Sequence, residues 1–165
     1  MKKQGYILYA LLLTHIISQA QVAPGDIAFV GYNADNNDQF TIITTNYLED
    51  GTQIYFVDAG WTGTAIYASE GGILWTVPSG GVPTNTMVTF TGGGAGGCTT
   101  FPSGNLEAGV TVSSGTIAAS GIAASMALTT NGDQILAFTG SVASPTFIAA
   151  ANFNGAWSWT GTNNS

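Results

Sequence analysis

Short runs of β-branched and aromatic residues recur along this chain, and turn-forming residues bound each of them. The run at 52–58, Thr-Gln-Ile-Tyr-Phe-Val-Asp, is typical, because it is too short and too β-branched for a helix and follows a glycine. Since most runs are spaced for hairpins rather than helical crossovers, we expect an all-β fold, an antiparallel β-sandwich. The predicted strands lie at 26–32, 39–45, 52–58, 72–77, 86–91, 133–139 and 146–153.

Two connections contain the residue pairs of tight turns. Asp-Gly within 49–52 and Asn-Gly within 130–133 favour positive φ, and both are predicted to be hairpin corners. The alanine-rich segment 115–126 repeats Ile-Ala-Ala-Ser at a spacing of five, which matches no helical period, and two glycines interrupt it. We therefore expect a loop or an irregular strand there, with at most one turn of helix.

The first twenty residues have the features of an export signal. Lys2 and Lys3 precede a mostly apolar stretch at 6–17, and the small residue Ala20 ends the segment where signal peptidase would cut. A membrane anchor is the alternative, but about twelve apolar residues fall short of the roughly 20 that a spanning helix needs. The sequence predicts a cleaved signal peptide over 1–20, a β-sandwich domain over 21–159, and a polar tail over 160–165 that could begin a linker. The protein is expected to be secreted, extracellular or on the cell surface.

Beyond residue 20 the chain has no lysine, arginine or histidine, whereas all nine acidic residues lie there. A surface without cationic side chains cannot neutralise phosphates, so binding to nucleic acid is excluded. There is also no histidine to act as a base, and no cation beside the single cysteine, Cys98, to make it a nucleophile. We therefore expect no catalytic residues and no enzymatic activity. The acidic residues are Asp26, Asp35, Asp38, Glu49, Asp50, Asp58, Glu70, Glu107 and Asp133.

The loop at 33–38 is a candidate metal site. Asn33, Asp35 and Asp38 offer the oxygen ligands that Ca²⁺ prefers, although the spacing is not that of an EF-hand. Asparagine and aspartate are also ordinary turn residues, and turn chemistry alone explains the loop. Apart from Ca²⁺ at this loop, no cofactor is expected.

The aromatic residues suggest a second kind of site. Trp157 and Trp159 alternate by two and could expose one ring to stack on a sugar, whereas Trp75 and Trp61 are expected to pack in the core and at a strand end. A pair of carboxylates for glycoside hydrolysis is a further alternative, but the spacing of the acidic residues singles out no pair. Its members would come from Glu49, Asp58, Glu70 and Glu107.

Three blocks, at 24–35, 48–58 and 128–138, carry a family resemblance. In their order and turn patterns they resemble an N-terminal β-rich module of exported bacterial cell-surface proteins, and they are distantly similar to lamin-tail domains. The resemblance implies an immunoglobulin-like sandwich outside the cell and a role in binding or spacing.

These observations favour a non-catalytic binding or structural module of a secreted or cell-surface bacterial protein. Its expected partners are other domains of the same, longer chain or components of the cell surface. A carbohydrate-binding module that uses exposed aromatic rings is the first alternative, and a small acidic hydrolase is the second.

Overall fold

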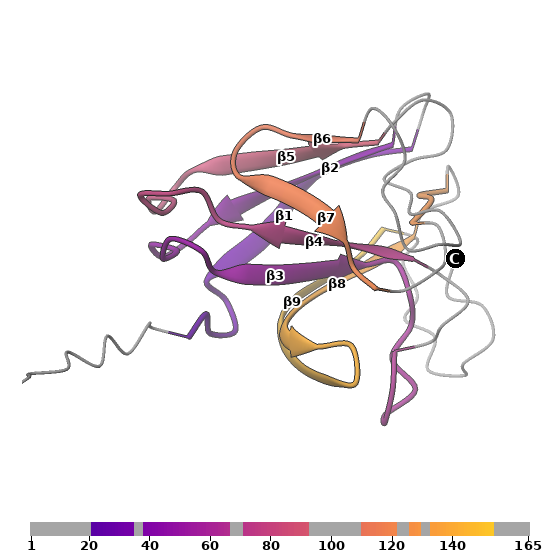
Figure 1. Ribbon diagram of the computed structural model, residues 1–165. Helices are drawn as coiled ribbons and strands as arrows, with labels where there is room; N and C mark the ends of the chain where they lie inside the picture. Colours follow the sequence, from indigo (N-terminus) through magenta and orange to yellow (C-terminus); the bar gives the residue numbers. More distant parts are fainter. Residues whose placement is uncertain are drawn as a thin grey trace, which may run out of the picture.

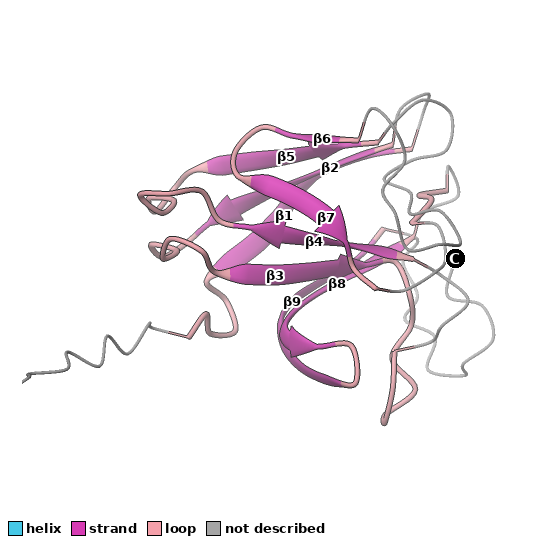
Figure 2. Cartoon of the chain, viewed as in Figure 1, coloured by secondary structure: helices cyan, strands magenta, loops and turns pink. Residues whose placement is uncertain are grey.

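The computed structural model describes residues 21–34, 38–66, 71–92, 110–121, 126–129 and 133–153. Within these ranges every regular element is a β-strand and none is a helix (Figure 2). The predicted all-β class is confirmed.

In the part of the chain that the structure describes, nine strands form two antiparallel sheets that lie one behind the other (Figure 1). The four-stranded sheet has the order β1-β2-β5-β6, and the five-stranded sheet has the order β7-β4-β3-β8-β9. All neighbouring strands in both sheets are antiparallel. The strands are β1 (Ile27–Asn33), β2 (Gln39–Thr44), β3 (Gln53–Val57), β4 (Gly72–Thr76), β5 (Met87–Thr91), β6 (Thr111–Val112), β7 (Thr116–Ala119), β8 (Gln134–Ser141) and β9 (Ser144–Asn152).

All seven predicted strands are present, each within about two residues of the expected bounds. The two additional strands are β6, which has only two residues, and β7, which lies in the alanine-rich segment. The two residues of β6 are too few to show the alternation of apolar and polar residues that predicts a strand. In β7, pairing with β4 supplies the strand geometry that its own sequence only weakly favours.

The turn at 49–52 exists, but it is not the predicted hairpin corner. The Thr52 amide donates to the Glu49 carbonyl over 3.2 Å, and Gly51 has a φ of +74°, as an Asp-Gly turn requires. However, β2 pairs with β1 and β5, whereas β3 pairs with β4 and β8. The turn therefore carries the chain from one sheet to the other. The second predicted corner has its central pair outside the described residues.

The core lies between the sheets and is rich in aromatic rings. Phe40 and Phe90 of the four-stranded sheet pack on Phe56 of the five-stranded sheet, with ring centroids 5.2 and 4.9 Å from it. Trp75 is fully buried, as predicted, and its indole nitrogen donates to the Ser114 carbonyl over 2.8 Å. Large aromatic contacts of this kind dominate the stabilisation of a domain of this size.

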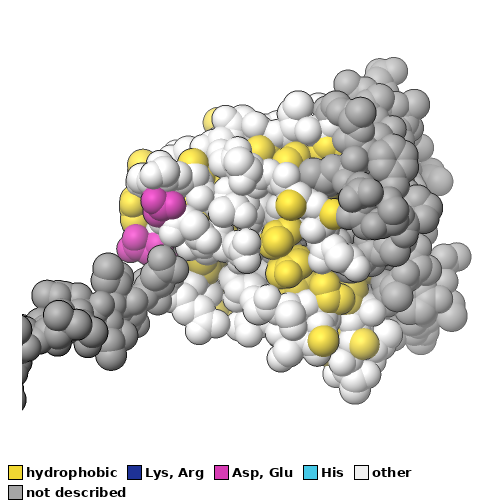
Figure 3. Space-filling view, in the orientation of Figure 1, with side chains coloured by type: hydrophobic (Ala, Val, Ile, Leu, Met, Phe, Trp, Pro, Cys, Tyr) yellow, Lys and Arg dark blue, Asp and Glu magenta, His cyan; other side chains and the backbone are white. Residues whose placement is uncertain are grey.

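The outer faces of the two sheets differ in polarity. On the four-stranded sheet, the hydroxyls of Thr41 and Thr89 lie 3.0 Å apart and face outward. On the five-stranded sheet, Ala118, Leu74 and Tyr55 occupy paired positions on adjacent strands. Figure 3 shows hydrophobic side chains across the middle of this view and exposed acidic side chains on its left.

Candidate functional site

Three buried carboxylates meet at one end of the two sheets. Asp38 precedes β2, Asp58 follows β3 and Asp133 precedes β8, so the antiparallel order brings all three to the same end, on the right in Figure 1. Their side chains are 7, 2 and 1% exposed. Carboxylates are rarely buried to this degree unless hydrogen bonds or charges satisfy them.

The carboxylates hold residues 126–129, which we call the strap. The backbone amide of Ala127 donates to Asp58 Oδ2 over 2.9 Å, and that of Leu128 donates to Asp38 Oδ2 over 2.7 Å. The Tyr32 hydroxyl donates to the Thr129 carbonyl over 2.5 Å. Three successive backbone positions of the strap are thus fixed by side chains from other elements.

The strap also contributes to the core. Met126 is fully buried and Leu128 is 6% exposed, and both belong to the main hydrophobic cluster between the sheets. Asp133 completes the arrangement by accepting the Gln134 amide over 2.8 Å, at the start of β8. At the strap, Asp38 and Asp58 therefore satisfy backbone donors that lie outside the sheet ladders.

At this end of the sheets, burial and the nearby carboxylates shift the pKa values of two side chains. Burial raises the pKa of Asp38 above its usual value of 3.8, and the hydrogen bond from Leu128 opposes this with a smaller effect. Burial is also the main reason that the pKa of Tyr32 rises to about 12, and the nearby charges of Asp133 and Asp38 add to it. Tyr32 therefore stays a neutral hydrogen-bond donor at physiological pH.

Of the three predicted calcium ligands, the structure describes two. Asn33 is the last residue of β1 and pairs with Gln39 in the ladder, while Asp38 turns inward to the strap. Asp35 lies outside the described residues. In the described ranges, no three acidic, cysteine or histidine residues are grouped as a metal ion would need. The calcium site stays a prediction.

Other sequence-predicted residues are placed only in part. Trp157, Trp159, Glu70, Glu107 and Cys98 all lie outside the described residues. Trp61 packs edge-on against Phe147 at a centroid distance of 5.2 Å, beside the end of β3 as expected.

The structure separates Glu49 and Asp58, which were candidates for one catalytic pair. They flank opposite ends of β3.

The grouping of Asp38, Asp58 and Asp133 was not predicted. These residues stand far apart in sequence and belong to different predicted turns, so only the strand order brings them together. The sequence held only a weak indication of the grouping. Each of the three aspartates borders a strand, at an end that antiparallel pairing places beside the others.

We expect Asp38→Asn to weaken the pH dependence of stability. Because the pKa of Asp38 is raised in the folded state, the folded chain takes up its proton first, and lowering the pH from 7 towards 3.8 stabilises the fold. Asparagine keeps an oxygen acceptor for the Leu128 amide but carries no charge to desolvate. Urea unfolding at pH 7 and pH 5 should show a variant at least as stable as the wild type at pH 7, with a smaller gain at pH 5.

The matched control is Asp50→Asn, which removes one exposed carboxylate charge next to Gly51 at the other end of β3. It should leave the pH dependence nearly intact. An Asp38→Asn protein that is less stable at pH 7 and keeps the full pH dependence would contradict the assignment.

No helix in the described ranges is long and apolar enough to cross a membrane. Comparison of the chain with models of known protein families, with curated proteins and with solved structures found no match.

Proposed function

We propose that this chain is a non-catalytic binding or structural module of an exported protein that acts outside the cell or on its surface. One observation carries the proposal: Asp38, Asp58 and Asp133 are buried and accept backbone amides, so they serve the fold rather than face a substrate. A general acid or base must lie within hydrogen-bond reach of the reacting group. At Asp38 and Asp58, backbone amides of the strap take the hydrogen-bonding positions that a reacting group would need.

The composition supports the same function. With no cationic side chain after residue 20, the domain has no group to clamp an anionic substrate or to lower the pKa of a nucleophile. A fold of two sheets with turns at both ends suits a module that presents surfaces and spaces its neighbours. We propose other domains of a longer chain, or components of the cell surface, as its partners. We also propose that the domain is distantly related to the immunoglobulin-like lamin-tail domains.

The location is tested by the N-terminus of the protein in its own cells. We expect intact mass measurement of the exported form to place the first residue at Gln21, because Ala20 ends the signal segment as a cleavage site should. Cell fractionation should find this form in the medium or on the surface. Recovery of a chain that retains Lys2 and Lys3 from the cytoplasm or a membrane would overturn the proposal.

A further inference from the structure

A pocket forms where β3 and β8 part. The paired positions of these strands run from Tyr55 to Val57 on β3, whereas β8 continues to pair with β9 as far as Ser141. The β8–β9 register shifts after Ala137, and Gly140 has a φ of +91°. The space between the diverging strands has a volume of about 300 Å³, and we call it the wedge pocket.

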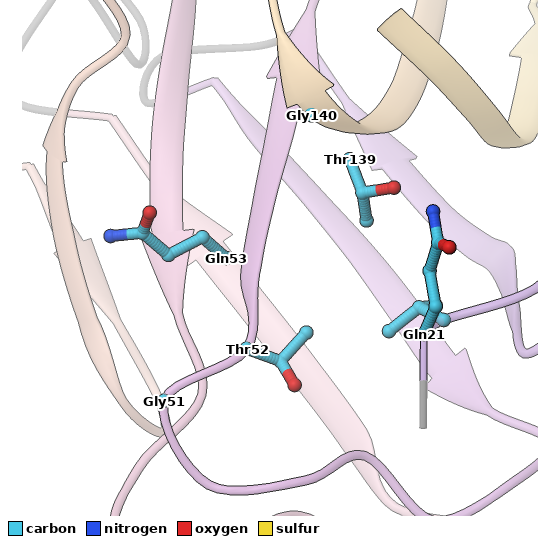
Figure 4. A pocket seen from close by; sticks show the side chains of 7 residues that line it. Gln21, Gly51, Thr52, Gln53, Thr139 and Gly140 are labelled. Atoms are coloured by element: carbon cyan, nitrogen blue, oxygen red, sulfur yellow. The ribbon is translucent and has the colours of Figure 1, made fainter. Parts of the chain in front are cut away.

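Neutral polar groups and small residues line the wedge pocket. Gln53 at the start of β3 and Thr52 just before it form one side, Thr139 of β8 forms a second, and Gln21 closes a third (Figure 4). Gly51 and Gly140 leave room, and the only apolar side chain in the lining is Val22. Amides and hydroxyls can each donate and accept hydrogen bonds, so the lining suits a ligand with the same dual capacity and without charge.

Thr139 supplies the observation that points to a ligand. Its side chain is only 8% exposed, and its Oγ1 is buried without a hydrogen-bond partner among the described residues. In Figure 4 this hydroxyl is directed across the pocket towards the side chain of Gln21. A buried hydroxyl without a partner is costly, so a group that reached it from the pocket and hydrogen-bonded to it would be favoured.

We propose that the wedge pocket binds a neutral carbohydrate and holds a single sugar ring of it. A hydroxyl of that ring would form a hydrogen bond with Thr139 Oγ1. The volume is at the small end of the range for ligand pockets, which fits a single sugar ring. No side chain in the lining is charged, so none recognises a phosphate, a carboxylate or an amine by an ion pair. This inference rests on the proposed function as a binding module and names the ligand class of that module.

The test is a titration of the exported ¹⁵N-labelled protein with glucose, galactose and N-acetylglucosamine, followed by amide chemical shifts. At least one sugar should give saturable shifts at Gln53, Gly140 and the Gln21 side chain, with a Kd on the order of 1 mM. Thr139→Val should weaken that binding at least about tenfold, the effect of losing one hydrogen bond to a site built for it. Thr146→Val removes the exposed hydroxyl at the paired position on β9 and should leave binding unchanged.

Thermal unfolding of the free protein separates a ligand role from a folding role. Because valine has the shape of threonine without the orphan hydroxyl, Thr139→Val should raise Tm by about 3 °C. A lower Tm would show that the fold itself satisfies the hydroxyl, and it would overturn the inference. So would a titration in which no sugar shifts these amides, or in which N-acetylalanine amide shifts them and no sugar does. The proposed function is tested separately by the intact mass measurement and the cell fractionation, whose results do not depend on whether a sugar binds.

Discussion

Phe56→Ala is expected to lower the free energy of unfolding by about 3 to 5 kcal/mol, the usual cost of deleting a buried aromatic ring. Phe56 is fully buried, and its ring is the centre of the aromatic core. It packs against Phe29, Phe40 and Phe90 of one sheet and against Trp75 of its own. The truncation therefore removes contacts that join the two sheets, and a domain with a total stability of about 5 to 15 kcal/mol loses a large share of it.

Urea unfolding of the purified domain measures this effect. Met87→Ala is the control, because Met87 is 66% exposed and its truncation should change stability by no more than about 0.5 kcal/mol. A loss below about 1 kcal/mol in Phe56→Ala would mean that the side chains of β3 face the opposite way.

Gly115→Ala is the second substitution with a large expected effect. Gly115 has a φ of +85°, a conformation that costs a residue with a Cβ about 1 to 2 kcal/mol. An added Cβ would also lie within 2.5 Å of Trp75 Nε1 and closer still to the Thr76 carbonyl oxygen. Relieving these contacts should displace the indole from the Ser114 carbonyl and add about 1 to 3 kcal/mol. The expected total loss in unfolding free energy is about 2 to 5 kcal/mol.

Gly80→Ala separates the two contributions. Gly80 has a φ of +86°, but an added Cβ there would meet nothing within 4 Å. Its loss in unfolding free energy should therefore be the backbone cost alone, about 1 to 2 kcal/mol. Equal losses in the two variants would contradict the close packing of Trp75 against this turn.

The strands could be predicted from the sequence because each carries its own local signal. The run that became β3 alternates Ile54 and Phe56 inward with Tyr55 outward, and that pattern does not depend on the neighbouring strands. The sheet to which each strand belongs could not be predicted in this way. The turn at Gly51 has the chemistry of a hairpin, yet it joins strands of different sheets, because the packing of the whole chain decides the pairing.

The buried acidic end was harder to predict for the same reason. In the sequence, Asp38 belongs to an Asn- and Asp-rich loop, and Asp58 simply ends a strand, so both are expected in solvent. Their burial depends on the strap, whose residues 126–129 form no regular element. A hydrogen bond between Asp38 and a residue 90 positions later leaves no trace in local sequence patterns.

The strap explains how a domain without cationic side chains beyond residue 20 can bury carboxylates. Backbone amides supply the partial positive charge that lysine or arginine would supply elsewhere. Asp38 and Asp58 bind the strap, which is why we assign them a structural role and propose a ligand site at the wedge pocket instead.

Hydrogen exchange at the Ala127 and Leu128 amides measures whether Asp58 and Asp38 hold the strap. If Asp58 and Asp38 hold the strap, both amides should exchange at least about a thousandfold more slowly than in an unfolded chain, an opening free energy of about 4 kcal/mol. Asp58→Ala should speed exchange at Ala127, whereas Asp58→Asn, which keeps an acceptor oxygen, should largely preserve the protection. Exchange of both amides at the unfolded rate in the wild-type protein would show that the carboxylates do not hold the strap, and would contradict the account.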